Sequence, residues 1–158
     1  MRPLDRVSGA CALLAALLLA AGCTTSPAPR SASGPQATSP IAQRSINAAQ
    51  ALLDQGNAQG ALDEAAKAVR VDGRSAKARI IRGAALEALG RGLEAGEDYK
   101  EAVRLAPASG PVLNAYGAWL CRSGRTDEAL KAFTDATADT TYRQPTQALA
   151  NAGSCAGE

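Results

Sequence analysis

The sequence predicts an all-α fold, a solenoid of about three helix-turn-helix repeats followed by one terminal helix. The first observation is a step of 34 residues that separates Gly56, Gly90 and Gly124. The second is that other small residues keep this step: Ala61, Ala95 and Ala129; Ala68, Ala102 and Ala136; and Gly83 with Gly117. The third is composition, because aromatic residues make up only 3% of the chain. That value suits closely packed helices and argues against a β-sandwich.

This period is typical of the tetratricopeptide repeat, a helix-turn-helix unit that stacks into a solenoid. Such solenoids present extended surfaces for binding rather than one deep catalytic pocket. The pattern therefore favours a molecule that binds other proteins, and no small-molecule substrate is expected. The net charge is +2 and the chain has no long basic run, so nucleic acid is not an expected partner.

Residues 1–22 are expected to form a lipoprotein signal peptide. Arg2 and Arg6 precede an apolar stretch of 15 residues, short for a membrane span but suitable for a signal-peptide core. It ends in Leu19-Ala-Ala-Gly-Cys23, which resembles the bacterial lipobox and makes Cys23 the expected lipidation site. Because Thr24 and not Asp follows, we expect a lipid anchor at the periplasmic face of the outer membrane. The alternative is an ordinary signal peptide with an incidental cysteine.

Residues 23–39 are predicted to be the lipidated cysteine and a disordered tether. Pro27, Pro29 and Pro35 lie there among Ser, Thr and Ala, and such a segment cannot bury enough apolar surface to fold. The repeat domain is then expected over 40–156.

Repeat one, about 42–75, is predicted to have helices at 41–55 and 58–71. Ser39 and Pro40 suit the N-cap and the first helical position. Gly56-Asn57 forms the turn between the helices, and Asp72-Gly73 ends the second helix.

Repeat two, about 76–109, is predicted to have helices at 76–89 and from the Gly90 turn to Leu105, with Pro107 as the stop. Repeat three, about 110–143, opens at Ser109-Gly-Pro111 and turns at Gly124. Thr126 is the expected cap of its second helix, which runs to about residue 138.

A last amphipathic helix is expected at 145–156, with Leu149 and Ala152 on one face. The alternative is a chain truncated from a longer array.

Recurrent small residues indicate where helices cross closely. Glycine in a helix costs about 1 kcal/mol relative to alanine, so the recurrence of Gly83 and Gly117 predicts tight packing against the second helix of the same repeat. Tyr99 and Phe133 are expected to fill the hydrophobic site between the helices, where repeat one has the small Ala65.

Two stretches near the end carry a more specific resemblance. The first is Gly110-Pro-Val-Leu-Asn-Ala-Tyr-Gly-Ala-Trp-Leu-Cys121, followed by Gly124-Arg-Thr-Asp-Glu-Ala129. The second is Tyr142-Arg-Gln-Pro145, followed by Ala148-Leu-Ala-Asn-Ala-Gly-Ser-Cys-Ala156. Together they resemble the PilF/PilW family of type IV pilus biogenesis lipoproteins, over about residues 40–156 and specifically from 110 onward.

The resemblance implies an outer-membrane lipoprotein whose repeats lie in the periplasm and bind a secretin or another pilus assembly protein. Some family members act as pilotins that support localisation or multimerisation of the secretin, and others stabilise the pilus. Two departures are evident. Family members continue for about two more repeats, and Ala115 follows Asn114 where an Asn pair is common.

The resemblance also implies a disulfide between Cys121 and Cys155. Strict periodicity would place these residues one interhelical distance apart, about 8–10 Å, which is too far for a disulfide. The segment from Tyr142 to Pro145 is expected to add two residues, so that Gly153 matches Gly117 and Cys155 matches Trp119. Two free buried thiols are the alternative.

Catalytic chemistry is not expected. The chain contains no His, which removes Ser-His and Cys-His catalysis and the usual zinc sites; no catalytic residue, metal site or cofactor is predicted. Arg79, Arg82 and Arg91 are read as a solvated helix face. The acidic residues Glu94, Glu97, Asp98 and Glu101 are read as exposed surface charge beside Lys100 and Arg104.

The expected binding groove is built from the first helix of each repeat. Its candidates are Asn47, Gln50 and Asp54 in repeat one; Lys77, Ile80, Ile81, Ala84 and Glu87 in repeat two; and Asn114, Ala118 and Arg122 in repeat three. Ile81 is either an apolar anchor for a partner or a core residue. Asn114 bonds either a bound peptide or a neighbouring helix.

The sequence thus favours a secretin pilotin or pilus-assembly adaptor without catalysis. The rival is a general envelope scaffold that docks cell-wall or outer-membrane assembly proteins. A truncated paralogue that no longer binds is a third possibility.

Overall fold

The computed structural model describes residues 39–157, which form seven α-helices and contain no strand. The helices are α1 (Pro40–Asp54), α2 (Ala58–Val71), α3 (Ala76–Ala88), α4 (Gly92–Leu105), α5 (Gly110–Arg122), α6 (Thr126–Thr137) and α7 (Pro145–Ala156). They begin and end within two residues of the predicted positions. The predicted signal peptide, the lipidation site Cys23 and almost all of the tether lie outside the described residues. The all-α fold class is confirmed.

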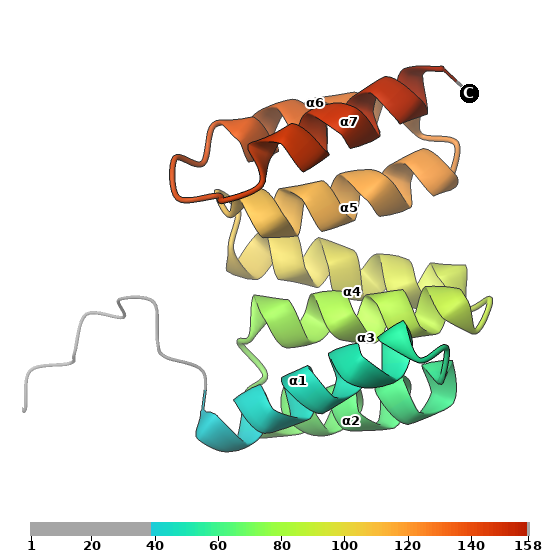
Figure 1. Ribbon diagram of the computed structural model, residues 1–158, viewed down its shortest axis with the longest axis vertical. Coiled ribbons are helices and arrows are strands. Elements are labelled where there is room, and N and C mark those ends of the chain that lie inside the picture. Colours follow the sequence, from blue (N-terminus) through green and yellow to red (C-terminus); the bar gives the residue numbers. More distant parts are fainter. Residues whose placement is uncertain (1–38, 158) are drawn as a thin grey trace, which may run out of the picture. The chain divides into compact units, whose positions relative to one another are not determined.

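Consecutive helices pack as the pairs α1/α2, α3/α4 and α5/α6, which stack on one another, and α7 packs on α5 and α6 (Figure 1). The turn inside each pair has one repeated geometry. Gly56, Gly90 and Gly124 have φ of 76°, 74° and 73°, a left-handed conformation that glycine adopts without steric cost. The residue after each glycine donates its N–H to a carbonyl five residues back, as in Asn57 to Leu52, which closes the helix end. The 34-residue glycine step therefore reflects one turn made three times.

The core has two clusters of buried side chains. Ile46, Ala49, Ala65, Ala68, Ala78 and Ile81 fill the space between repeats one and two. Larger side chains, among them Tyr99, Trp119, Leu120 and Phe133, fill repeats two and three and the face under α7. Trp119 lies between Tyr99 and Tyr116, with ring centroids 6.1 and 5.7 Å away.

Gly83 and Gly117 lie where sequence reasoning expected close crossings, and the prediction is confirmed. A Cβ atom at Gly83 would lie 3.1 Å from the Tyr99 ring, and one at Gly117 would lie 2.8 Å from the Phe133 ring. Gly96 makes a similar approach that the sequence reasoning missed, because its Cβ would lie 2.4 Å from Trp119. It does not belong to the 34-residue pattern, since repeat three has Leu130 at that position.

One local prediction was wrong. Thr126 is the first residue of α6 and not its cap; Arg125 takes the N-cap position, without a side-chain hydrogen bond. The predicted apolar face of α7 is covered only in part: Ala152 is partly buried but Leu149 is 60% exposed, and the fully buried residues of the helix are Ala148 and Cys155. The apolar pattern of a helix marks the faces that avoid water, but it does not tell which of them has a neighbour.

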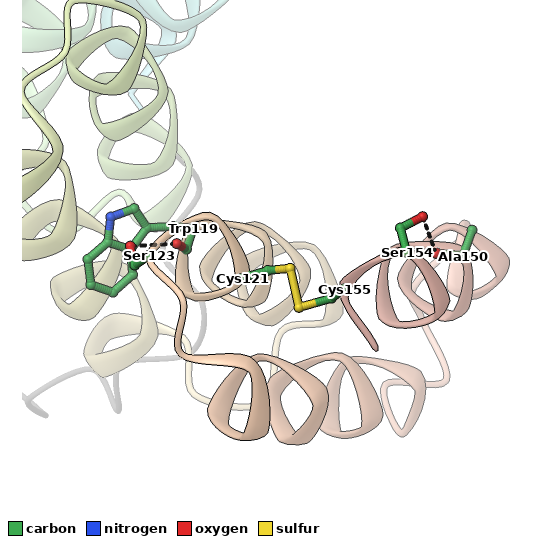
Figure 2. Close-up of a disulfide and its surroundings, with 6 residues drawn as sticks. All are labelled: Trp119, Cys121, Ser123, Ala150, Ser154 and Cys155. Carbon is green, nitrogen blue, oxygen red and sulfur yellow. Dashed lines mark hydrogen bonds between the residues drawn. A yellow bond between two sulfur atoms is a disulfide. The ribbon is translucent and has the colours of Figure 1, made fainter. Parts of the chain in front are cut away.

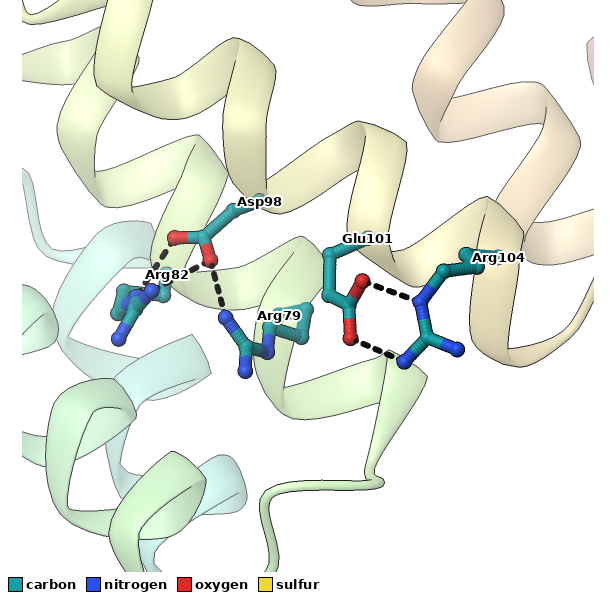
Figure 3. Close-up of polar contacts among 5 residues, drawn as sticks. All are labelled: Arg79, Arg82, Asp98, Glu101 and Arg104. Carbon is teal, nitrogen blue, oxygen red and sulfur yellow. Dashed lines mark hydrogen bonds and ion pairs between the residues drawn. The ribbon is translucent and has the colours of Figure 1, made fainter.

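The reading of Asp98 as exposed surface charge was also wrong. Asp98 on α4 is only 1% exposed and lies between two arginines of α3 (Figure 3). Arg82 Nε donates to Asp98 Oδ2 at 2.6 Å, and Arg79 Nη1 donates to Oδ1 at 3.2 Å. Arg79 and Arg82 are therefore half-buried partners of a carboxylate rather than a solvated face. Glu94 and Glu97, by contrast, are exposed as expected.

A paired substitution tests the close crossing at Gly117. Gly117→Ala is expected to lower the free energy of unfolding by about 1–2 kcal/mol, because overpacking at the Phe133 ring outweighs the gain in helix propensity. Gly153→Ala is the matched control. Apart from the backbone of its own helix, no atom lies within 4 Å of its added Cβ, so it is expected to stabilise by up to about 1 kcal/mol. Urea denaturation followed by circular dichroism measures both, and equal effects of the two substitutions would contradict the packing argument.

Candidate functional site

The first helix of each pair and α7 form one continuous row. Neighbours in this row, α1 with α3, α3 with α5 and α5 with α7, contact one another directly (Figure 1). We call the solvent-exposed side of this row the first-helix face. All the predicted groove residues lie on α1, α3 or α5, so the structure does bring their helices together.

The candidates differ in how far they reach solvent. Asn47, Gln50, Lys77 and Arg122 are exposed, and Ile80, Ala84, Glu87, Asn114 and Ala118 are partly exposed. Asp54 is exposed and accepts a hydrogen bond from Gln50 at 2.9 Å. Ile81 is only 7% exposed and packs in the core with Ile46 and Ala78. Ile81 is therefore a core residue and is removed from the groove candidates.

Glu87 and Arg122 pair across the row and link α3 to α5. Arg122 donates from Nε to Glu87 Oε1 at 3.0 Å and from Nη2 to Oε2 at 2.7 Å. The Tyr99 hydroxyl donates to the same Oε2 at 2.7 Å. The hydrogen bond with Glu87 raises the pKa of Arg122, and burial raises the pKa of Tyr99, so both stay protonated donors. The charges of this cluster compensate each other, so it supports the face rather than presenting a free charge.

Asn114 is held by Asn151 on α7, a residue that the sequence reasoning did not select. Asn151 Nδ2 donates to Asn114 Oδ1 at 3.0 Å. Of the two roles considered for Asn114, the neighbouring helix is the one observed. The pair spans 37 residues, whereas Glu87 and Arg122 span 35. The sequence separation between contacting residues of neighbouring first helices is thus two residues larger at α7. This agrees with the two residues that the segment from Tyr142 to Pro145 was predicted to add.

Cys121 and Cys155 are joined in a disulfide with a Cα–Cα distance of 5.8 Å, which links α5 to α7 (Figure 2). Beside it lies a small hollow of about 160 Å³ lined by Ala118, Arg122, Phe133, Asn151 and Ser154. Two predicted groove residues, Ala118 and Arg122, thus border the disulfide.

The α6–α7 connection is fastened to the start of α5. The Asp139 carboxylate accepts the Gly110 N–H at 2.7 Å and the Thr141 N–H at 2.9 Å. These hydrogen bonds, that of Gly110 first, lower the pKa of Asp139. Tyr142 packs so closely on Gly110 that a Cβ there would lie 2.6 Å from the ring. An open pocket of about 560 Å³, lined by Asn114, Arg143 and Gln147 among others, lies beside this connection.

Within residues 39–157, no helix is long and apolar enough to cross a membrane. In the same range, no three His, Cys, Asp or Glu side chains come together in a way that could hold a metal ion.

The stacked helix pairs define a tetratricopeptide-repeat fold, which is a scaffold for protein interaction. The family described as Tetratricopeptide repeat matches residues 46–110. No curated protein sequence matches the chain.

Among solved structures, the chain is similar to PilW, a widely conserved type IV pilus biogenesis factor, with 26% identity and a TM-score of 0.70. The match covers 75% of this chain and 54% of PilW. PilF of Pseudomonas aeruginosa also matches with 26% identity and a TM-score of 0.70, over 73% of this chain and 52% of that one. The chain therefore spans about half the length of these two pilus factors.

The Sgt2 tetratricopeptide domain of Aspergillus fumigatus matches at 16% identity and a TM-score of 0.66, over 78% of this chain and 83% of that one. That likeness shows the fold alone. The chain thus has a tetratricopeptide-repeat fold and is similar to two type IV pilus factors.

Proposed function

We propose that this protein is an outer-membrane-anchored periplasmic adaptor for type IV pilus biogenesis, which assists secretin localisation and multimerisation or pilus stability by binding a protein partner. The observation that carries the proposal is the similarity to PilW and PilF over about three-quarters of the chain. Anchoring rests on the lipobox at Cys23, and the sequence after Tyr142 agrees with the pilus family.

The first-helix face is the proposed binding surface. Ile80, Ala84 and Ala118 leave a partly exposed, uncharged strip on α3 and α5, suited to apolar side chains of a partner segment. Lys77, Asn47 and Gln50 offer exposed polar groups on the same row of helices. The Glu87–Arg122 pair and the disulfide fix how α3, α5 and α7 sit relative to one another, and a preorganised surface loses less entropy on binding.

Deletion of the gene tests the biological role. We expect loss of heat-resistant secretin multimers on gels, or loss of surface pili with normal multimers if the role is pilus stability, and impaired twitching in both cases. Re-expression of the full chain should restore the lost phenotype. Normal multimers, normal pili and normal twitching would favour the alternative, a general envelope scaffold for cell-wall or outer-membrane assembly proteins.

A surface variant tests the binding face directly. Ala84→Arg combined with Ala118→Arg places two charges on the uncharged strip and is expected to lower partner binding, measured as co-purified secretin or pilus protein, by roughly tenfold or more. Thr134→Arg is the matched control, because Thr134 is an exposed residue of α6 outside the row. Circular dichroism checks that all variants fold. Equal co-purification by the double variant and the wild-type chain would exclude this face.

A further inference from the structure

The start of α1 and the connections α2–α3, α4–α5 and α6–α7 all lie at one edge of the stack (Figure 1). These connections are residues 72–75, 106–109 and 138–144. The turns at Gly56, Gly90 and Gly124 lie at the opposite edge. We call the first of the two the entry edge, because the chain that precedes Pro40 enters the stack there.

The entry edge holds every cation of residues 39–157 that has no ion-pair partner. Nine basic residues in this range pair with a carboxylate. The other five are all exposed: Arg44, Arg70, Arg74, Lys77 and Arg143. Three of them lie in helices, close to the helix end that meets this edge, and two lie in the connections.

Acidic groups at the entry edge are fewer and are bound to backbone N–H groups. The Asp72 carboxylate accepts the Arg74 N–H at 3.1 Å, and the Asp139 carboxylate accepts those of Gly110 and Thr141. The other acidic residues of the described range that form no ion pair lie at the opposite edge or in the half of α2 next to it: Asp54, Asp63 and Asp127. The stack is therefore polarised, with its free positive charge at the entry edge.

Helix stability does not account for these cations. The partial positive charge at a helix N-terminus favours acidic side chains in the first turn. Helices α4 and α6, which begin at the opposite edge, follow this rule with Glu94, Asp127 and Glu128. The first turns of α1, α3, α5 and α7, which begin at the entry edge, contain no acidic residue, and Lys77 lies in that of α3. The four helix N-termini thus add to the positive potential of this edge.

We propose that the entry edge binds the anionic headgroups of the membrane that carries the lipid anchor. The proposal rests on the anchoring at Cys23 that is part of the proposed function. Sixteen residues separate Cys23 from Pro40, and a flexible linker of that length spans roughly 20–25 Å. The anchor therefore holds the entry edge close to the bilayer surface, where the complementary charge is found.

The distribution of the cations favours an extended surface over a single small ligand. Arg44 lies on α1, whereas Arg143 lies beside α7 at the other end of the stack. A bilayer with anionic lipid attracts each basic residue near its surface, by roughly fivefold in affinity for each one. The helices run away from the entry edge (Figure 1). The first-helix face, which the sides of these helices form, therefore stays accessible to a protein partner.

The test uses the chain from residue 23 onward with Cys23→Ser, so that no lipid contributes to binding. The described residues belong to one compact unit, which this chain retains. Co-sedimentation is expected to show saturable binding to vesicles that contain phosphatidylglycerol, and at least tenfold weaker binding to vesicles of phosphatidylcholine alone. Binding should fall as salt rises, since the Debye length shrinks from about 10 Å at 0.1 M to about 3 Å at 1 M.

A triple variant removes three of the unpaired cations: Arg44→Gln, Arg70→Gln and Arg74→Gln. None of these residues is a groove candidate, and all three are exposed. Binding to the anionic vesicles is expected to weaken at least tenfold.

The matched control removes the same charge away from the edge, from the interior of α2, α4 and α6: Lys67→Gln, Lys100→Gln and Lys131→Gln. These lysines form exposed ion pairs within their own helices, which contribute little to stability. Vesicle binding is expected to stay within twofold of the parent chain. Circular dichroism checks that both triple variants fold.

Three outcomes would overturn the proposal. The first is binding that phosphatidylglycerol does not strengthen. The second is an arginine variant that loses no more affinity than the lysine variant, which would assign binding to net charge and not to the edge. The third is binding of polyglutamate but not of vesicles through the three arginines, which would assign the edge to an acidic segment of a protein.

The proposed function is tested separately. Palmitate labelling of the wild-type chain reports on the anchor at Cys23, and the secretin and twitching assays report on the pilus role. Vesicle binding by the unlipidated chain depends on neither, so each result can fail while the others hold.

Discussion

Replacing Cys121 and Cys155 with alanine is expected to lower the free energy of unfolding by about 3–4 kcal/mol. The disulfide closes a loop of 34 residues, and opening it returns conformational freedom to the unfolded chain. The loop contains all of α6 and the connection to α7. Urea denaturation of the oxidised wild type and of the double variant measures the difference.

The loss of stability in the double cysteine variant should be greatest at α7. In that helix only Ala148 and Cys155 are fully buried, so little apolar area holds it once the covalent link is gone. Hydrogen exchange is expected to show early loss of protection in α7, while α3 and α4 keep theirs. Ser154→Ala is the control, because its hydroxyl bonds only the Ala150 carbonyl of its own helix. A double variant within 1 kcal/mol of wild type, with α7 still protected, would contradict this expectation.

Replacing Asp98 with alanine is expected to destabilise the protein by about 3 kcal/mol. The substitution leaves Arg79 and Arg82 half-buried without their shared carboxylate, and a buried charge that loses its partner is costly. Chemical denaturation at neutral pH measures the change. A loss below about 1 kcal/mol would mean that the arginines turn into solvent at little cost.

The chain itself supplies the control for Asp98. One repeat later, the residues equivalent to Arg79, Arg82 and Asp98 are Leu113, Tyr116 and Ala132. The triple variant Arg79→Leu, Arg82→Tyr, Asp98→Ala transfers that apolar set into repeat two. It is expected to equal or exceed wild-type stability, because a buried ion pair replaced by packed apolar groups is often neutral or stabilising. A triple variant as unstable as Asp98→Ala alone would show that repeat two cannot accept this apolar set.

The helices could be predicted closely because their ends depend on local chemistry. Gly56, Gly90 and Gly124 mark turns that require positive φ, and Pro107 cannot continue α4. Gly83 and Gly117 revealed close crossings because glycine is unfavourable in a helix unless space demands it.

Features that depend on contacts between helices were harder to predict. Asp98 lies next to Glu97 and Lys100 in a charged helix, and only the three-dimensional packing shows that α3 brings two arginines to it. Leu149 follows the apolar pattern of Leu113, but the helix that covers Leu113 has no counterpart at α7 among the described residues. The periodicity of a helix shows which of its faces is apolar, but it does not show whether another helix covers that face.

The candidate site was predicted in part. Glu87 and Arg122 were both selected, but their pairing was not, and Asn151 was missed entirely. The sequence spacing could have predicted both pairs. Contacts between neighbouring first helices join residues one position beyond the repeat step, 35 for Glu87–Arg122 and 37 for Asn114–Asn151 across the shifted repeat.

The position of Trp119 gives the protein a built-in optical reporter. It is the single tryptophan of the chain. Its indole packs against Tyr99, approaches the Gly92 carbonyl of α4 at 3.4 Å, and has the Arg125 guanidinium 5.7 Å from its ring centroid. Its fluorescence emission therefore reports on the interface between the second and third repeats, whereas circular dichroism averages over every helix. In a linear array, each repeat contacts only its neighbours. If the interface between repeats two and three opens before the helices unfold, the unfolding curve from tryptophan fluorescence will no longer coincide with the curve from circular dichroism.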